Sequence, residues 1–112
     1  MTTRAHLRRS ALRLPGVEET PDHGALVFAV RGEAFAWATA DGAAELAMSP
    51  QDASATLERF ASAEPLTRGG EQVGVRVPLA AVNGMELNAL LEKAWRSKAP
   101  PEHVALRRAA AR

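Results

Sequence analysis

The chain has 112 residues, a net charge of +1 and no cysteine. Its length fits one domain, and the lack of thiols excludes disulfides, cysteine nucleophiles and cysteine-based zinc sites. The apolar fraction of 46% indicates a folded protein rather than a disordered one. No apolar run reaches the roughly 20 residues that cross a bilayer, and no apolar segment of a signal peptide follows the basic start. We therefore expect a cytoplasmic protein without membrane contact.

The charges are unevenly distributed along the chain. Residues 1–13 carry four arginines and no acid, residues 96–112 sum to +4, and the segment between them sums to −7. Positive termini of this kind are a hint of contact with nucleic acid or another anion. Ordinary solvated helix faces produce the same pattern, so both interpretations stay open.

A first helix is predicted over about residues 4–13, with Thr3 as its N-cap. Its apolar stripe, at positions i, i+4 and i+7, consists of Leu7, Ala11 and Leu14. Pro15-Gly16 ends the helix. Residues 17–24 are rich in acids and contain Pro21, and we expect them to form a loop.

From residue 25 the apolar pattern has a period of two, which predicts a three-stranded antiparallel meander over residues 25–48. The two turns are expected at Gly32-Glu33 and at Asp41-Gly42, the second pair being typical of a type I′ hairpin. The alternation places Phe35 and Trp37 on the same face of the second strand. We expect Trp37 to be buried in the core rather than to serve as a stacking platform.

The second half of the chain predicts two more helices and one more strand. Ser49-Pro50 is a good helix start, because a hydroxyl caps the helix and proline occupies its first turn. Residues 62–72 are expected to form a polar loop, and the alternating valines of residues 73–77 predict a fourth strand. Asn83 and Glu86 form a capping-box pair for the last long helix.

That last helix has the clearest apolar stripe in the sequence, which consists of Leu87, Leu90, Leu91, Ala94 and Trp95. We expect Trp95 and Leu91 to be buried together with Phe28 between this helix and the sheet. The prolines after Ala99 end the helix. Residues 1–100 are therefore predicted to form a single α+β domain, and residues 101–112 a basic tail that has the composition of a short helix.

The sequence offers no catalytic constellation. Its histidines, His6, His23 and His103, lack the spacing of metal ligands. No serine lies in a Gly-x-Ser-x-Gly elbow, and no Lys-Ser/Thr pair follows Gly69-Gly70 to make a P-loop. We expect a protein that is not an enzyme and that has no metal site and no cofactor.

Several blocks of the sequence resemble the MmcQ/YjbR-like family of small bacterial proteins, over about residues 5–98. The most specific block is Leu-Pro-Gly-Val-Glu-Glu at residues 14–19. The supporting blocks are residues 28–32, 35–36, 48–50, 75–79, 86–91 and 94–95. The resemblance implies a CyaY/frataxin-like fold, in which helices pack on one face of an antiparallel sheet, and it implies DNA binding, the property with which the family is usually labelled.

The chain departs from that family pattern at positions that bear on function. Relatives often carry lysine after the turn glycine and a basic residue in the third strand, where this chain has Glu33 and Ala47. If relatives bind nucleic acid through the open sheet face, this chain has less positive charge there. Frataxin-type iron sites lie on an acidic first helix, whereas residues 4–13 hold arginines and no carboxylate, so iron binding is not expected.

Two hypotheses for function follow. The first is weak, non-specific DNA binding, in which arginines at both ends contact phosphates without reading bases. Its candidate residues are Arg4, Arg8, Arg9, Arg107 and Arg108. The alternative is a non-enzymatic module that binds an unknown protein or ligand through the open sheet face. Phosphate contacts weaken steeply as salt rises, which separates the two.

Overall fold

The computed structural model describes residues 2–110, and it describes side chains as far as residue 105. It shows one six-stranded sheet with the order β1-β2-β3-β4-β6-β5, in which all neighbouring strands are antiparallel. The strands are β1 (Val17–Asp22), β2 (Ala25–Val30), β3 (Glu33–Ala38), β4 (Ala43–Ala47), β5 (Glu64–Arg68) and β6 (Glu71–Pro78). The helices are α1 (Arg4–Leu12), α2 (Pro50–Arg59), α3 (Gly84–Lys98) and α4 (Pro101–Ala110), with a 3₁₀ turn η1 (Leu79–Ala81) before α3. The predicted α+β fold class is confirmed.

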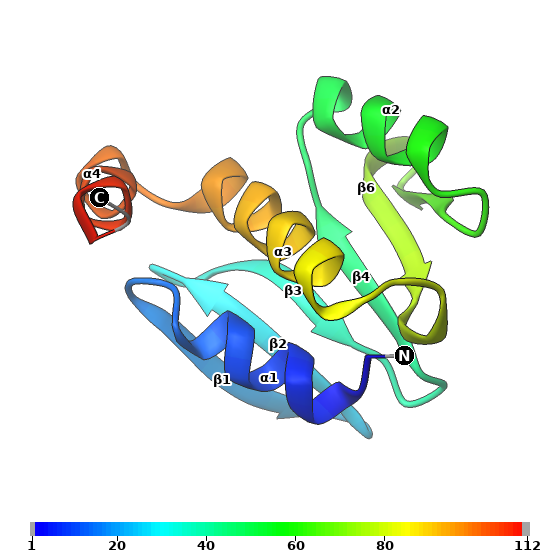
Figure 1. The fold of residues 1–112 in the computed structure, drawn as a ribbon, viewed down its shortest axis with the longest axis horizontal. Coiled ribbons are helices and arrows are strands. Elements are labelled where there is room, and N and C mark those ends of the chain that lie inside the picture. Colours follow the sequence, from blue (N-terminus) through cyan, green and yellow to red (C-terminus); the bar gives the residue numbers. More distant parts are fainter. Residues whose placement is uncertain (1, 111–112) are drawn as a thin grey trace.

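Helices α1, α2 and α3 share one hydrophobic core with one face of the sheet. In Figure 1, α1 and α3 cross in front of the strands, and α4 lies beyond the end of the sheet. Most buried strand residues lie on this face, and in the second half of β2 they alternate with a more exposed residue, as expected for a sheet covered on one side. They include Phe28, Val30, Ala36, Ala38, Ala44, Leu46, Val75 and Val77.

The predicted core of the last helix is confirmed. Trp95 and Phe28 are 0% exposed and Leu91 is 1% exposed. Asn83 and Glu86 form the predicted capping box, with the Asn83 side chain accepting from the Glu86 amide at 2.8 Å. The predicted Thr3 cap and the buried stripe of α1 are confirmed as well.

Residues 17–24 are not a loop, as the sequence suggested, but contain the edge strand β1. Val17 pairs with Val30 and packs against the core, while Glu18 and Thr20 alternate with it. Acidic residues and proline are depleted in strands, so the sequence predicted a loop here. Both are tolerated in an edge strand, which is why β1 can form.

Residues 62–72 also contain an edge strand that the sequence did not reveal. β5 pairs with β6 around a two-residue turn, in which Gly69 and Gly70 have φ of +60° and +85°. Positive φ at both central residues is the type I′ geometry that matches strand twist. The glycine pair marks a hairpin rather than a loop.

The turn predicted at Gly32-Glu33 lies one residue earlier, at Arg31-Gly32, where φ is positive at both residues. The turn between β3 and β4 is not type I′, because Asp41 lacks the positive φ that this type requires. The Gly42 amide donates to the Thr39 carbonyl at 3.3 Å and Gly42 has φ +89°, which fits a type I turn followed by a glycine bulge.

A β-bulge in the pairing of β2 with β3 overturns the expected position of Trp37. Phe28 pairs with Ala36 and Ala29 pairs with Ala34, so Phe35 is the extra residue. Phe35 is fully buried, whereas Trp37 pairs with Val27 and is only partly buried. The two rings therefore lie on opposite faces of the sheet, and Trp37 is not a core residue.

The Pro15-Gly16 corner after α1 is fixed by two distant side chains. The Trp95 indole donates to the Pro15 carbonyl at 3.0 Å. Gly16 has φ +73°, and a Cβ at this position would lie 2.6 Å from the ring of His103 in α4. The corner therefore needs glycine both for its backbone conformation and for its contact with α4.

Candidate functional site

Two of the predicted DNA-binding arginines are engaged within the protein. Arg8 on α1 contacts the Glu19 carboxylate of β1 at 2.7 Å, and the hydrogen bond and charge of Glu19 raise the pKa of Arg8. Arg4 donates to the Gly24 carbonyl in the β1–β2 turn. A phosphate would have to compete with these partners.

The structure does not bring the described basic residues of the two termini together. Arg4 lies at the β1–β2 turn, whereas the start of α4 contacts the other end of α1, where His103 meets Gly16. Arg9 is exposed on α1, and within residues 2–105 its side chain forms no hydrogen bond or ion pair. The side chains of Arg107 and Arg108 lie outside the described residues.

Within the described residues, no helix packs on the face of the sheet opposite α1, α2 and α3, and this face carries a continuous row of side chains. The row follows the cross-strand register, because directly opposed residues point to the same face. From β1 to β5 it consists of Thr20, Val27, Trp37, Glu45, Arg76 and Glu64. We call this face the open face and this set the central row.

Trp37 is the only aromatic side chain of the central row, and it stacks with an arginine. The Arg68 guanidinium of β5 lies 4.7 Å from the centroid of the Trp37 ring. Arg68 also reaches the Glu45 carboxylate, at 3.9 Å. Its side chain is 54% exposed, so this cation–π pair lies at the surface, where such contacts are weak.

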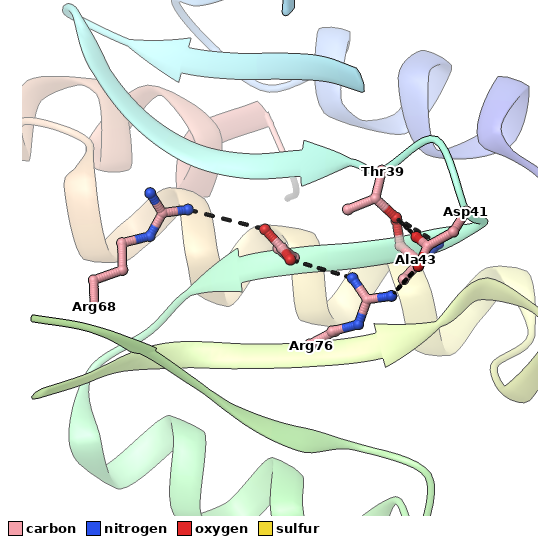
Figure 2. Close-up of polar contacts among 6 residues, drawn as sticks. Thr39, Asp41, Ala43, Arg68 and Arg76 are labelled. Carbon is pink, nitrogen blue, oxygen red and sulfur yellow. Dashed lines mark hydrogen bonds and ion pairs between the residues drawn. The ribbon is translucent and has the colours of Figure 1, made fainter. Parts of the chain in front are cut away.

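A ladder of charged hydrogen bonds continues from Glu45 across the open face (Figure 2). Arg76 contacts Glu45 at 3.2 Å and Asp41 at 2.6 Å. The Thr39 hydroxyl donates to Asp41. The hydrogen bonds from Thr39 and then from Arg76 lower the pKa of Asp41. In Figure 2 the helices lie behind the strands that carry Arg68 and Arg76.

Carboxylates outnumber guanidinium groups on the open face. Glu64 pairs with Arg76 across strands and Glu71 pairs with Arg68, while Glu18 lies two residues from Thr20, on the same side of β1. By strand alternation, cross-strand pairing and side-chain contact, the acids over this face are Glu18, Asp22, Asp41, Glu45, Glu64 and Glu71, and the bases are Arg68 and Arg76. The open face is therefore acidic around a central tryptophan.

The polar cluster between α1 and α3 has a structural role. Asn88 Oδ1 accepts from Ser10 Oγ at 2.6 Å and lies 3.2 Å from His6 Nε2. A shallow hollow beside it is lined by Arg13, Leu14 and Leu91, together with Ser10 and Asn88. The two contacts of Asn88 Oδ1 tie α1 to α3.

Within the part of the chain that the structure describes, no group of three or more His, Asp and Glu side chains could hold a metal ion. His23 Nε2 lies 3.6 Å from the Asp22 carboxylate. The same residues contain no helix that is long and apolar enough to cross a membrane.

Sequence reasoning missed Arg68, Glu45 and Arg76 as members of a site. One signal was available, because Glu45 and Arg76 occupy alternating positions of recognisable strands. The contact of Arg68 with Trp37 could not be predicted from the sequence, because it depends on the strand β5 and on the bulge at Phe35.

Comparison with known proteins identifies a family for this chain. The YjbR family model matches residues 12–97, from the end of α1 to the end of α3. No curated protein and no solved structure matches the chain. The chain therefore belongs to the YjbR family, as its sequence blocks indicated, while the likeness to CyaY stays a prediction.

Proposed function

We propose that this member of the YjbR family is a non-enzymatic binding module that engages a protein partner through the open face. The observation that supports this most directly is Trp37, a large aromatic side chain on a face that no helix covers. Tryptophan and arginine are the side chains most enriched at binding hot spots, and here Trp37 and Arg68 are in contact.

The surroundings of Trp37 favour a contact with a flat surface over catalysis. Its neighbours on β2 and β3 are small or apolar, and include Val27, Ala29 and Ala34. The charged residues beside it neutralise one another through Glu45 and Arg76. Such a face offers a shallow apolar centre with a polar rim, the anatomy of protein interfaces.

The test is site-specific photo-crosslinking in a lysate of cells that produce the protein. Val27→benzoylphenylalanine places the reactive group on the open face. Met85→benzoylphenylalanine is the matched control, because Met85 is 83% exposed on α3, on the helix side. We expect adducts from position 27 that disappear when Trp37→Ala is added. Equal adducts from both positions, or adducts that persist without Trp37, would contradict the proposal.

A second candidate function is weak, non-specific DNA binding through the basic termini. Arg9 and Arg13 support it, because both are exposed on α1 and neither forms an ion pair within residues 2–105. Contacts of this kind would be electrostatic, with dissociation constants on the order of 10⁻⁴–10⁻⁶ M at physiological salt.

Fluorescence anisotropy with two unrelated duplexes at several salt concentrations tests this candidate. We expect equal affinity for both duplexes and a steep loss as salt rises, and a smaller salt slope for the Arg9→Gln/Arg13→Gln variant. Absence of binding at low salt would reject DNA binding. Unchanged affinity after removal of residues 102–112 would place the contact on α1 alone.

A further inference from the structure

We infer that the partner segment that lies on the open face is cationic and partly apolar. This inference rests on the proposed function and adds the chemical class of the partner. Three observations support it: the charge of the open face, the prolines in the two edge strands, and the charged side chains beside the Trp37 ring.

The charge of the open face favours a positive partner. Arg76 is already bonded to both Asp41 and Glu45, whereas Glu18 and Glu64 form no ion pair within residues 2–105. Complementary charge across an interface sets partner choice, and like charges that face one another suppress binding of the wrong partner. A nucleic acid would bring its phosphates against this surplus of carboxylates.

The centre of the face is already a cation acceptor. The Trp37 ring holds the Arg68 guanidinium at 4.7 Å, and the Glu45 carboxylate lies beside it, 3.9 Å from Arg68. An aromatic ring next to a carboxylate is the usual combination for recognising an ammonium or guanidinium group. Because Arg68 is 54% exposed, a partner's lysine or arginine can replace it at little cost.

The two edges of the sheet disfavour binding by addition of a partner strand. Pro21 lies in the edge strand β1 and Pro65 in the edge strand β5. Proline lacks the N–H that a further strand would need, and proline on an edge is a common barrier to strand addition. The partner is therefore expected to lie across the face rather than to extend the sheet.

The central row defines the size of this partner segment. Adjacent strands are about 4.8 Å apart, so the row spans about 24 Å from β1 to β5. Its two ends are Thr20 on β1, beside Glu18 on the same side of that strand, and Glu64 on β5, with Val27 and Trp37 between them. A matching segment has an apolar centre with lysine or arginine towards both ends.

Selection from a displayed library of random peptides tests this inference. The library is selected on the whole protein and counter-selected on a Trp37→Ala variant whose fold has been checked by circular dichroism. We expect the peptides that require Trp37 to carry net positive charge around an apolar centre. The Glu18→Gln/Glu64→Gln variant should bind them about five-fold more weakly, and Glu58→Gln, which changes an exposed acid on α2, should bind them as the wild type does.

The outcomes separate the two proposals. Peptides that require Trp37 but are neutral or acidic would overturn the cationic partner and leave the open-face module standing. A selection that yields no peptide dependent on Trp37 would overturn both. Self-association in size-exclusion chromatography that disappears in the Trp37→Ala variant would make a second copy the occupant, and would overturn the inference of a foreign cationic segment.

Discussion

The two faces of the sheet hold the two tryptophans of this chain in contrasting environments. Trp95 on α3 is 0% exposed, and its indole donates to the Pro15 carbonyl at 3.0 Å. Trp37 lies on the open face, partly buried, with its ring against an exposed arginine. One ring is buried in the core and the other lies at the surface, so the same residue type has a structural role on one face and, in the function we propose, a binding role on the other.

This contrast leads us to expect large stability losses from substitutions on the covered face and small ones on the open face. Burial of a large aromatic ring is among the strongest single contributions to a core. Surface pairs between charged groups contribute little, because water screens them.

Trp95→Ala should lower the free energy of unfolding by about 3–5 kcal/mol, because it removes a fully buried ring and leaves a cavity. It also leaves the Pro15 carbonyl without its donor. Urea denaturation followed by circular dichroism measures the loss. A loss below about 1 kcal/mol would contradict the core position of Trp95 and would remove the contrast between the two faces.

Gly74→Ala should cost about 3 kcal/mol, because a Cβ at Gly74 would collide with the Leu46 carbonyl of the neighbouring strand β4. A backbone carbonyl cannot move aside without breaking the sheet. Gly70→Ala is the matched control, since nothing lies within 4 Å of a Cβ there and only its φ of +85° opposes the change. Thermal melts of both variants test this, and equal losses would show that β4 and β6 can separate locally.

Much of the covered face could be predicted from the sequence, because helix caps and apolar periodicity are local signals. The capping box at Asn83 and Glu86 and the stripe that contains Trp95 were identified for this reason. The position of Trp37 could not be predicted, because the bulge at Phe35 depends on how β3 pairs with β2. A single extra residue moves every later side chain of the strand to the other face.

The candidate site was less predictable than the core, because it depends on contacts between segments far apart in the chain. Arg68 meets Trp37 only because β5 folds back along β6, and β5 contains Pro65, which argues against a strand. The arginines chosen for DNA binding were selected by charge alone. Sequence could not show that Arg8 is paired with Glu19.

Asp41→Asn should reduce stability at neutral pH but not in acid. The bonds from Thr39 and Arg76 hold the pKa of Asp41 below its usual value. The carboxylate therefore contributes above its unfolded pKa of about 3.9, and this contribution is lost as the pH falls through the lower folded pKa. Urea melts at pH 7 and near pH 2 should show the difference between wild type and variant shrinking. A difference that stays constant would exclude an electrostatic origin.

The smallest expected effect concerns the open face itself. Trp37→Leu should cost no more than about 1 kcal/mol, because the ring is only partly buried and no helix packs on it. A double-mutant cycle with Arg68→Gln isolates the ring–guanidinium contact, for which we expect a coupling of about 0.5 kcal/mol at this exposure. Both cycles are measured by urea melts. A second cycle, which combines Trp37→Leu with Arg59→Gln, is the control and should show no coupling.

A loss above about 2 kcal/mol in the free energy of unfolding for Trp37→Leu would mean that the fold depends on Trp37 as it does on Trp95. A small loss would show that Trp37 contributes little to the stability of the fold, which is what the proposed role of this ring in binding requires.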